Sequence, residues 1–133
     1  MPVKDIHQTV AFKNVTPHDV YESLMDSKRH AAFTGGKARI SREIDGKCEA
    51  YDGWIEAFNV ELVPDEKIVQ KWRGADWAED VYSVATFKFA KIGADTKLTF
   101  TQIGVPVEFV EEIDDGWRTE YWEKMAEYFK SVN

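Results

Sequence analysis

The sequence predicts an α+β fold: one antiparallel sheet of about six or seven strands, a long C-terminal helix that covers it, and two short helices after the first strand. Apolar residues alternate with a period of two in residues 3–13 and again between residues 37 and 104, which is typical of strands with one buried face. The connections between these strands are too short for parallel crossovers, so neighbouring strands must be antiparallel. Residues 109–132 carry a single apolar face with helical period, which can cover the sheet.

Two short helices are expected after the first strand. The first begins after Thr16, whose hydroxyl suits the N-cap position, and Pro17 fits the first helical position because its φ is already helical. The second is predicted to follow Ser27 and to end before Thr34, where a Gly-Gly pair interrupts the helical pattern.

Turn residues divide the middle of the chain into six further strands. Asp45-Gly46 and Asp52-Gly53 fit the two central positions of a type I′ hairpin turn, which both need positive φ. Another turn contains Pro64, because proline is preset for the second position of a turn. The predicted strands are residues 37–44, 47–52, 54–63, 66–73, 80–91 and 96–104.

The final helix is amphipathic and unusually aromatic. At about 100° per residue, Trp117, Tyr121 and Met125 fall within one wide apolar arc, and charged side chains occupy the opposite side. This arc is first of all a packing surface for the sheet. Arg118 lies about 100° from Trp117, inside the arc, where a charged residue is unexpected.

Composition and charge limit the classes of partner. A chain of 133 residues is long enough for a single domain with its own core, which we assign to residues 1–133. The net charge of −7 and the pI near 5.0 disfavour nucleic acid and anionic membrane surfaces as partners. The single cysteine, Cys48, has no internal disulfide partner, and neither a hydrophobic leader nor a membrane-spanning run appears. A cytoplasmic location is therefore expected.

Patterns that would indicate catalysis or metal binding do not occur in the sequence. His7, His18 and His30 have no metal-ligand spacing and no accompanying cysteine cluster. Nucleophile-elbow, zinc-protease and phosphate-loop motifs are missing. We accordingly predict no catalytic residue, no metal and no cofactor.

Polar side chains on apolar strand faces point to a binding site. Alternate residues of a strand face opposite sides of the sheet. If the more hydrophobic set of alternate residues in each strand faces inward, Glu56, Gln70 and Gln102 lie among core residues. Burying such groups unpaired costs about 1–3 kcal/mol each, so they indicate a paired internal network or a water-containing cavity. We hypothesise that Arg118 meets Glu56 or the glutamine amides there; the alternative is that strand bulges or helix ends turn these groups to solvent. The predicted cavity-lining residues are Trp54, Glu56, Phe58, Gln70, Trp72, Phe87, Phe100, Gln102, Trp117, Arg118, Tyr121 and Met125.

Several short motifs, in a characteristic order over essentially the whole chain, carry a family resemblance. They are Asp52-Gly53, Val63-Pro64, Ile68-Val69, Trp72-Arg73, Gly104-Val105-Pro106 and Gly116-Trp117. With them the chain resembles the C-terminal domain of the activator of heat-shock protein 90 ATPase, within the START-like (birch-pollen-allergen-like) group. The resemblance implies a helix-grip fold, in which a curved antiparallel sheet wraps the long C-terminal helix and leaves a cavity between them. Where relatives often have a Gly-Gly pair, this chain has Asp45-Gly46, which affects a turn only.

Three classes of function follow from these observations. The first is a non-enzymatic binding protein whose internal, mostly apolar cavity holds a small hydrophobic or amphipathic molecule. The second is a co-chaperone-like protein that contacts and stimulates a heat-shock protein 90 type ATPase, although the separate N-terminal chaperone-binding domain of the eukaryotic activator has no counterpart in these residues. The third is a cyclase- or aromatase-like enzyme, as found among related helix-grip proteins. The chain is expected to be a monomer or a weak homodimer formed through an edge strand.

Overall fold

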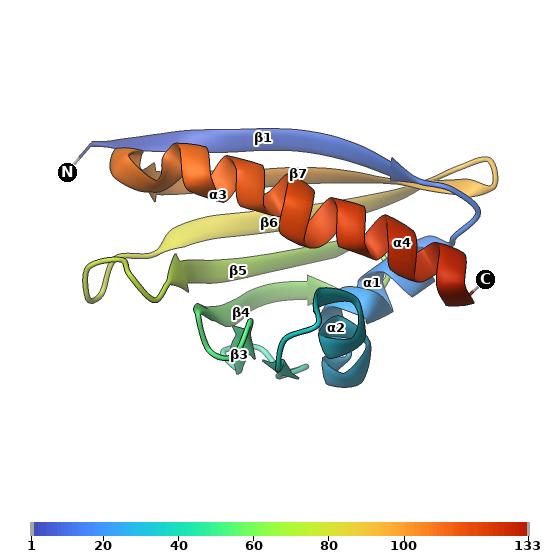
Figure 1. Cartoon of the computed structure of the whole chain (residues 1–133), viewed down its shortest axis with the longest axis horizontal. Coiled ribbons are helices and arrows are strands. Elements are labelled where there is room, and N and C mark those ends of the chain that lie inside the picture. The colour runs from blue at the N-terminus through green and yellow to red at the C-terminus, as the bar shows by residue number, and fades with distance from the viewer. Residues whose placement is uncertain (1, 133) are drawn as a thin grey trace.

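The computed structural model describes residues 2–132 and contains one seven-stranded antiparallel sheet with the strand order β1-β7-β6-β5-β4-β3-β2. The sheet curves around the long C-terminal helix, and two short helices lie at one end of it (Figure 1). The strands are β1 (Val3–Phe12), β2 (Arg39–Ile40), β3 (Lys47–Ala50), β4 (Ile55–Val63), β5 (Lys67–Gly74), β6 (Ser83–Ile92) and β7 (Asp95–Pro106). This arrangement confirms the predicted α+β, helix-grip fold.

The short helices are α1 (Pro17–Met25) and α2 (Ser27–Thr34). Thr16 caps α1 as predicted, because its hydroxyl accepts a hydrogen bond from the Asp19 amide at 3.1 Å. Gly35 ends α2 with a φ of 81°, a left-handed conformation that glycine adopts at little cost.

The C-terminal helix changes geometry in its middle. It consists of η1 (Val107–Phe109), α3 (Val110–Gly116), the π-helical segment η2 (Trp117–Trp122) and α4 (Glu123–Val132). At the end of η2 the amide of Glu123 donates to the carbonyl of Arg118, five residues earlier, so this turn accommodates one more residue than an α-helical turn.

The π turn shifts the buried stripe sideways along the helix. From α3 into the π segment, Ile113, Trp117 and Tyr121 form a buried row with a spacing of four. From the last residue of the π segment onward, the buried row continues from Trp122 through Met125. A uniform rotation of 100° per residue merges these two rows into a single wide arc, and the expectation that Arg118 lies within that arc was therefore wrong.

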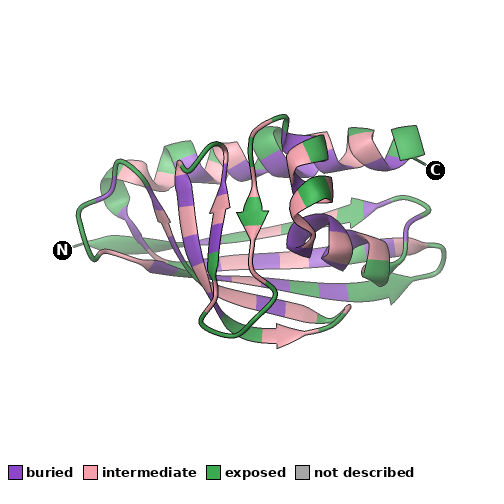
Figure 2. Cartoon of the chain, turned by 90° about the horizontal axis from the view of Figure 1, so that it is seen from below, coloured by how far each residue is buried: buried purple, intermediate pink, exposed green. Residues whose placement is uncertain are grey.

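The inward face of β4 differs from the prediction. Ile55, Ala57 and Asn59 point toward the helix, whereas Glu56 and Phe58 lie on the outer face of the sheet. Both parities of this strand carry large apolar residues, so hydrophobicity alone does not determine which face is buried. A bulge after Asn59 then shifts the register against β5 (Figure 2 shows the burial pattern along the strands).

The two predicted hairpin turns have different outcomes. Asp52-Gly53 forms a turn between β3 and β4, with φ values of 58° and 94°. Asp45-Gly46 does not form a type I′ turn, because Asp45 has a positive φ and Gly46 does not. Gly46 is required for another reason: a Cβ there would lie 1.9 Å from the Ser41 hydroxyl oxygen.

Two tryptophan side chains attach the helix to glutamines of the sheet. The indole nitrogen of Trp117 donates to the Gln102 side-chain oxygen at 2.8 Å, and that of Trp122 donates to the Gln8 side-chain oxygen at 2.6 Å. The Gln102 amide nitrogen in turn donates to the Ser83 hydroxyl at 2.9 Å. Gln102, one of the polar groups expected on an apolar strand face, therefore belongs to a paired internal network, and Gln8 of β1 forms a second, partly buried contact with the helix.

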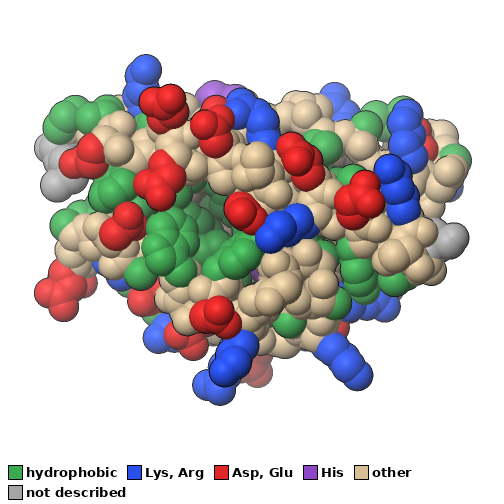
Figure 3. Space-filling model, in the orientation of Figure 1, with side chains coloured by type: hydrophobic (Ala, Val, Ile, Leu, Met, Phe, Trp, Pro, Cys, Tyr) green, Lys and Arg blue, Asp and Glu red, His purple; other side chains and the backbone are tan. Residues whose placement is uncertain are grey.

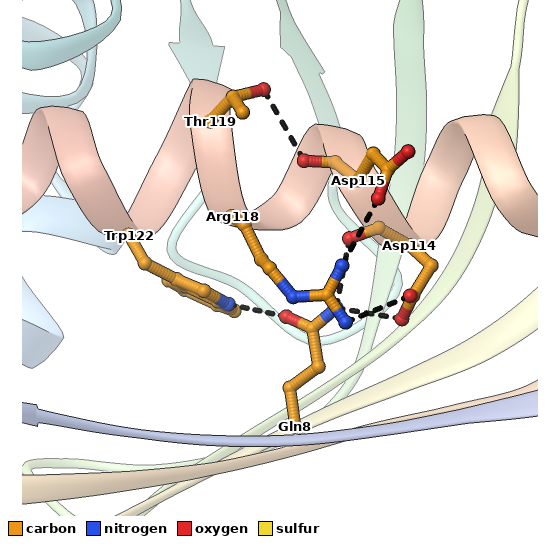
Figure 4. A network of polar contacts seen from close by, with 6 residues as sticks. All are labelled: Gln8, Asp114, Asp115, Arg118, Thr119 and Trp122. Atoms are coloured by element: carbon orange, nitrogen blue, oxygen red, sulfur yellow. Dashed lines mark hydrogen bonds and ion pairs between the residues drawn. The ribbon is translucent and has the colours of Figure 1, made fainter.

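The Gln8 network also includes the helix surface. The Gln8 amide nitrogen donates to the backbone and side-chain oxygens of Asp114, both at 2.8 Å. Arg118 binds the other carboxylate oxygen of Asp114 at 2.9 Å, so the network runs from the sheet to solvent (Figure 4).

None of the helices in the described residues is both long enough and apolar enough to span a membrane.

A double-mutant cycle tests the Trp117–Gln102 contact. Trp117→Phe and Gln102→Leu should each lower the free energy of unfolding by about 1–3 kcal/mol, because each leaves a buried polar group without its partner. The double variant should be clearly more stable than the sum of the two effects predicts, since both unpaired groups are then removed. Urea unfolding gives the free energy of unfolding for the unchanged chain, the two single variants and the double variant. Strictly additive losses would contradict a direct contact.

Candidate functional site

A groove lined mainly by apolar side chains lies beside the first half of the C-terminal helix. It has a volume of about 330 Å³ and lies between α3–η2 and the adjoining ends of β4 and β5. Figure 3 shows a hollow with hydrophobic side chains on the face that carries this helix. We call it the aromatic groove; its lining residues are Tyr51, Trp54, Ile55, Trp72, Glu112, Ile113, Gly116, Trp117, Glu120 and Tyr121.

The floor of the aromatic groove is a rigid set of aromatic rings. The ring centroid of Trp72 lies 6.2 Å from that of Trp54 and 5.7 Å from that of Trp117. Tyr121 lies 4.6 Å from Trp117 by the same measure. Trp72, Trp117 and Tyr121 are buried in the core, whereas Trp54 is half-buried at the rim. The floor is therefore held by the core, and Trp54 is its exposed edge.

The interior behind the groove is almost filled. The enclosed space between sheet and helix measures about 30 Å³, enough for about one or two water molecules. Trp117 occupies the position where a larger cavity would lie, with its ring centroid 4.4 Å from Phe100 and 5.6 Å from Phe87. Among residues 2–132, the space at this place is far smaller than the ligand-sized internal cavity that the family resemblance implies.

The predicted lining residues separate into four groups. Trp54, Trp72, Trp117 and Tyr121 line the aromatic groove, and Gln70 and Phe87 line the small enclosed space. Phe100, Gln102 and Met125 are fully buried in the packed core. Glu56, Phe58 and Arg118 lie outside it.

Glu56 and Arg118 do not meet. The Arg118 side chain is 51% exposed and pairs with Asp114 and Asp115, at 2.9 and 3.1 Å. Glu56, on the outer face of the sheet, accepts a hydrogen bond from the Tyr82 hydroxyl at 2.9 Å. The hypothesis of an internal Arg118–Glu56 contact was therefore wrong. Both side chains turn away from the interior, although neither lies at a strand bulge or at a helix end, as the alternative had supposed.

Six groove residues were not predicted: Tyr51, Ile55, Glu112, Ile113, Gly116 and Glu120. The spacing of four between Ile113, Trp117 and Tyr121 carried the necessary signal, but the single wide arc obscured it. Gly116 was noted only as part of a family motif. Its position in the middle of a helix was the clue to an unusual local surface.

A buried histidine supports the groove from behind. The Nδ1 of His30 donates to the Leu24 carbonyl at 3.0 Å, so its Nε2 accepts the hydroxyl proton of Tyr121 at 2.8 Å. Burial lowers the pKa of His30 to about 4, and burial raises the pKa of Tyr121 well above its usual value. Both side chains are thus neutral at pH 7 and join the α1–α2 pair to the groove wall.

The rim of the aromatic groove is acidic. Glu112 is exposed and has no ion-pair or hydrogen-bond partner among residues 2–132. The Glu120 carboxylate pairs with Lys124 at 2.8 Å, and the Glu120 carbonyl accepts the Tyr51 hydroxyl at 2.5 Å. The Lys124 ammonium lies 5.4 Å from the centre of the Tyr51 ring, and its hydrogen bond to Glu120 raises the pKa of Lys124.

In the described part of the chain no group of three or more His, Cys, Asp or Glu side chains is arranged to hold a metal ion.

Comparison with known proteins assigns the family. The family model described as "Activator of Hsp90 ATPase homolog 1-like protein" matches residues 14–130. The chain belongs to this family. It is 30% identical over 115 residues to the activator of 90 kDa heat shock protein ATPase homolog of Dictyostelium discoideum, and 28% identical over 114 residues to homolog 1 of Homo sapiens. These matches cover 86% of the chain, but only 30% and 34% of the relatives, so the chain spans about a third of their length.

A solved structure with the same fold is similar in size. The crystal structure of an HSP90 activator from Plasmodium falciparum superimposes with a TM-score of 0.85 at 24% identity. The match covers 91% of this chain and 92% of the Plasmodium chain. The likeness supports the helix-grip fold along nearly the whole of both molecules.

The His30–Tyr121 pair makes stability depend on pH. Between pH 6.5 and 4 the unfolded chain binds a proton at His30 that the folded chain does not, so stability falls as the pH is lowered through this range. The loss should reach about 3 kcal/mol at pH 4, since each pKa unit corresponds to about 1.4 kcal/mol. Urea unfolding at several pH values measures it. His30→Gln should be less stable at pH 7 and should show a weaker pH dependence; equal slopes for both proteins would contradict the assignment.

Proposed function

We propose that this domain acts as a co-chaperone that binds an Hsp90-type chaperone and stimulates its ATPase. The observation that carries the proposal is the family match over residues 14–130. The solved structure described as an HSP90 activator from Plasmodium falciparum supports it, because the match extends over 92% of the chain in that structure.

The surface of the domain suits contact with another protein. Tryptophan and tyrosine dominate the residues that contribute most to protein–protein binding, and the aromatic groove presents both at a half-open site. The net charge of −7 favours a partner with basic surface, because complementary charge accelerates encounter.

The chaperone proposal predicts a saturable rise in ATP hydrolysis. Adding the purified chain to a purified Hsp90-type chaperone should increase its ATPase rate, and a chaperone ATP-site inhibitor should abolish the whole signal. The same mixture should show binding by isothermal titration calorimetry. Absence of both heat and stimulation at roughly 100 μM chain, well above the Kd of typical specific complexes, would contradict the proposal.

A second candidate is binding of a small amphipathic molecule. One observation favours it: the volume of the aromatic groove lies near the lower end of the range of about 300–1,000 Å³ for ligand pockets. The site is the surface groove and not the interior, where the enclosed space is far smaller. No observation on the described residues favours the third class, catalysis on a hydrophobic substrate.

The small-molecule candidate predicts stabilisation by apolar ligands. In a thermal-shift screen a ligand at 100 times its Kd should add about 2.7 kcal/mol to the free energy of unfolding, because it binds only the folded state. Trp54→Ala should remove this stabilisation and Arg118→Gln should not, since Trp54 lines the groove and Arg118 does not. Native mass spectrometry of the purified protein provides an independent check. No shift with any hydrophobic compound, and no retained mass, would rule out this candidate.

A further inference from the structure

Gly116 occupies a helical position that does not require glycine. Its φ and ψ of −59° and −38° are ordinary helical values, and a Cβ built there meets nothing within 4 Å. Glycine inside a helix is less favourable than alanine, because it loses more conformational freedom on folding. At Gly74, in contrast, a Cβ would lie 2.8 Å from the Trp54 ring, so packing explains that glycine. The fold gives no such explanation for Gly116.

Because Gly116 has no side chain, the helix backbone itself forms the wall of the aromatic groove at this position. Gly116 lines the groove together with Trp54, whose ring forms part of its exposed edge. Any side chain longer than alanine at position 116 would project into open space within the groove. The local backbone is therefore accessible to a group that enters from outside, the situation in which glycine permits close approach.

The charges of the groove favour a basic occupant. Two of its lining residues, Glu112 and Glu120, are acidic, and none is basic. Glu120 already holds Lys124, whereas the Glu112 carboxylate is unpaired within residues 2–132. The position of Lys124 beside the Tyr51 ring shows that this rim accommodates a cation next to an aromatic face.

The openness of the groove favours a protein over a small molecule. Pockets for small molecules enclose most of the ligand surface, whereas this groove is open along one side. A protein segment inserts one anchor side chain, and the surrounding partner surface then excludes water from it.

We propose that the aromatic groove receives a protein segment with one large apolar side chain, which packs between Trp54 and Gly116, next to a lysine or arginine, which pairs with Glu112. The inference rests on the proposed function, because it takes the Hsp90-type chaperone as the source of that segment. It adds the chemistry of the contact and the residues that select it.

Two pairs of matched variants test the inference with the complete chain. Gly116→Leu fills the groove, and Gly116→Ala controls for the loss of glycine itself. Glu112→Gln removes the rim charge, and Glu111→Gln removes an exposed charge that does not line the groove. Circular dichroism and urea unfolding establish that all four variants are folded.

Binding to the purified chaperone is measured by titration calorimetry at low and high salt. Gly116→Leu should weaken binding by at least about tenfold, as expected when an anchor site is blocked. Glu112→Gln should weaken it by about threefold to tenfold and reduce its salt dependence, because a screened charge pair is lost. Gly116→Ala and Glu111→Gln should remain within about threefold of the unchanged chain.

A peptide arm separates this inference from the proposed function. The probes are two capped tetrapeptides with Gly at both ends, one with Trp-Lys and one with Trp-Glu in the centre. Their binding is monitored by the backbone-amide and indole NMR shifts of the protein. Selective shifts with the Trp-Lys peptide at Trp54 and Gly116, lost in Gly116→Leu, support the groove preference even if the chaperone itself does not bind.

Three outcomes overturn the inference. If the chaperone binds equally well to Gly116→Leu and Glu112→Gln, the groove is not the contact, although the proposed function survives. If neither the chaperone nor the Trp-Lys peptide binds, both proposals fail. If a small molecule from the expression host occupies the groove and is lost in Gly116→Leu, the occupant is a metabolite and the protein segment is excluded.

Discussion

Hydrogen bonds from two buried indoles fix how the C-terminal helix lies on the sheet. Trp117 and Trp122 are both buried, and their N–H groups find side-chain oxygens only where Gln102 and Gln8 project from the sheet. Because Gln8 belongs to β1 and Gln102 to β7, the two contacts determine the position of the helix along neighbouring strands. Sliding the helix by one turn would break both contacts and leave the two buried indole nitrogens and the buried Gln102 oxygen without these partners.

The π turn follows from the same requirement. Tyr121 and Trp122 are adjacent in sequence, yet both are buried, and the wider turn places both against the core. Tyr121 then reaches His30 on α2, while Trp122 reaches β1. The aromatic groove lies where the turn begins, so its floor is made of side chains whose positions the core has already determined.

Local signals in the sequence predicted the element order, and nonlocal packing decided the site. Thr16 and the alternation in β6 and β7 were interpreted correctly, because caps and one-sided strands depend on near neighbours. Glu56 and Phe58 were misplaced, since both faces of β4 are apolar and only the tertiary structure selects one. Arg118 was misplaced because a π turn has no reliable signature in sequence. The near absence of interior space depends on how Trp117 packs against Phe87 and Phe100, which no spacing rule contains.

Gly116 also has a consequence for how this surface evolves. Because a methyl group there meets no atom and favours the helix, replacement of this glycine should raise stability, and mutational drift alone would remove it. Persistence of an open wall would then require continued selection on whatever enters the groove. In a lineage that has lost the partner, a larger residue can replace glycine at this position. The residue found at position 116 of a relative therefore indicates whether the contact is still used.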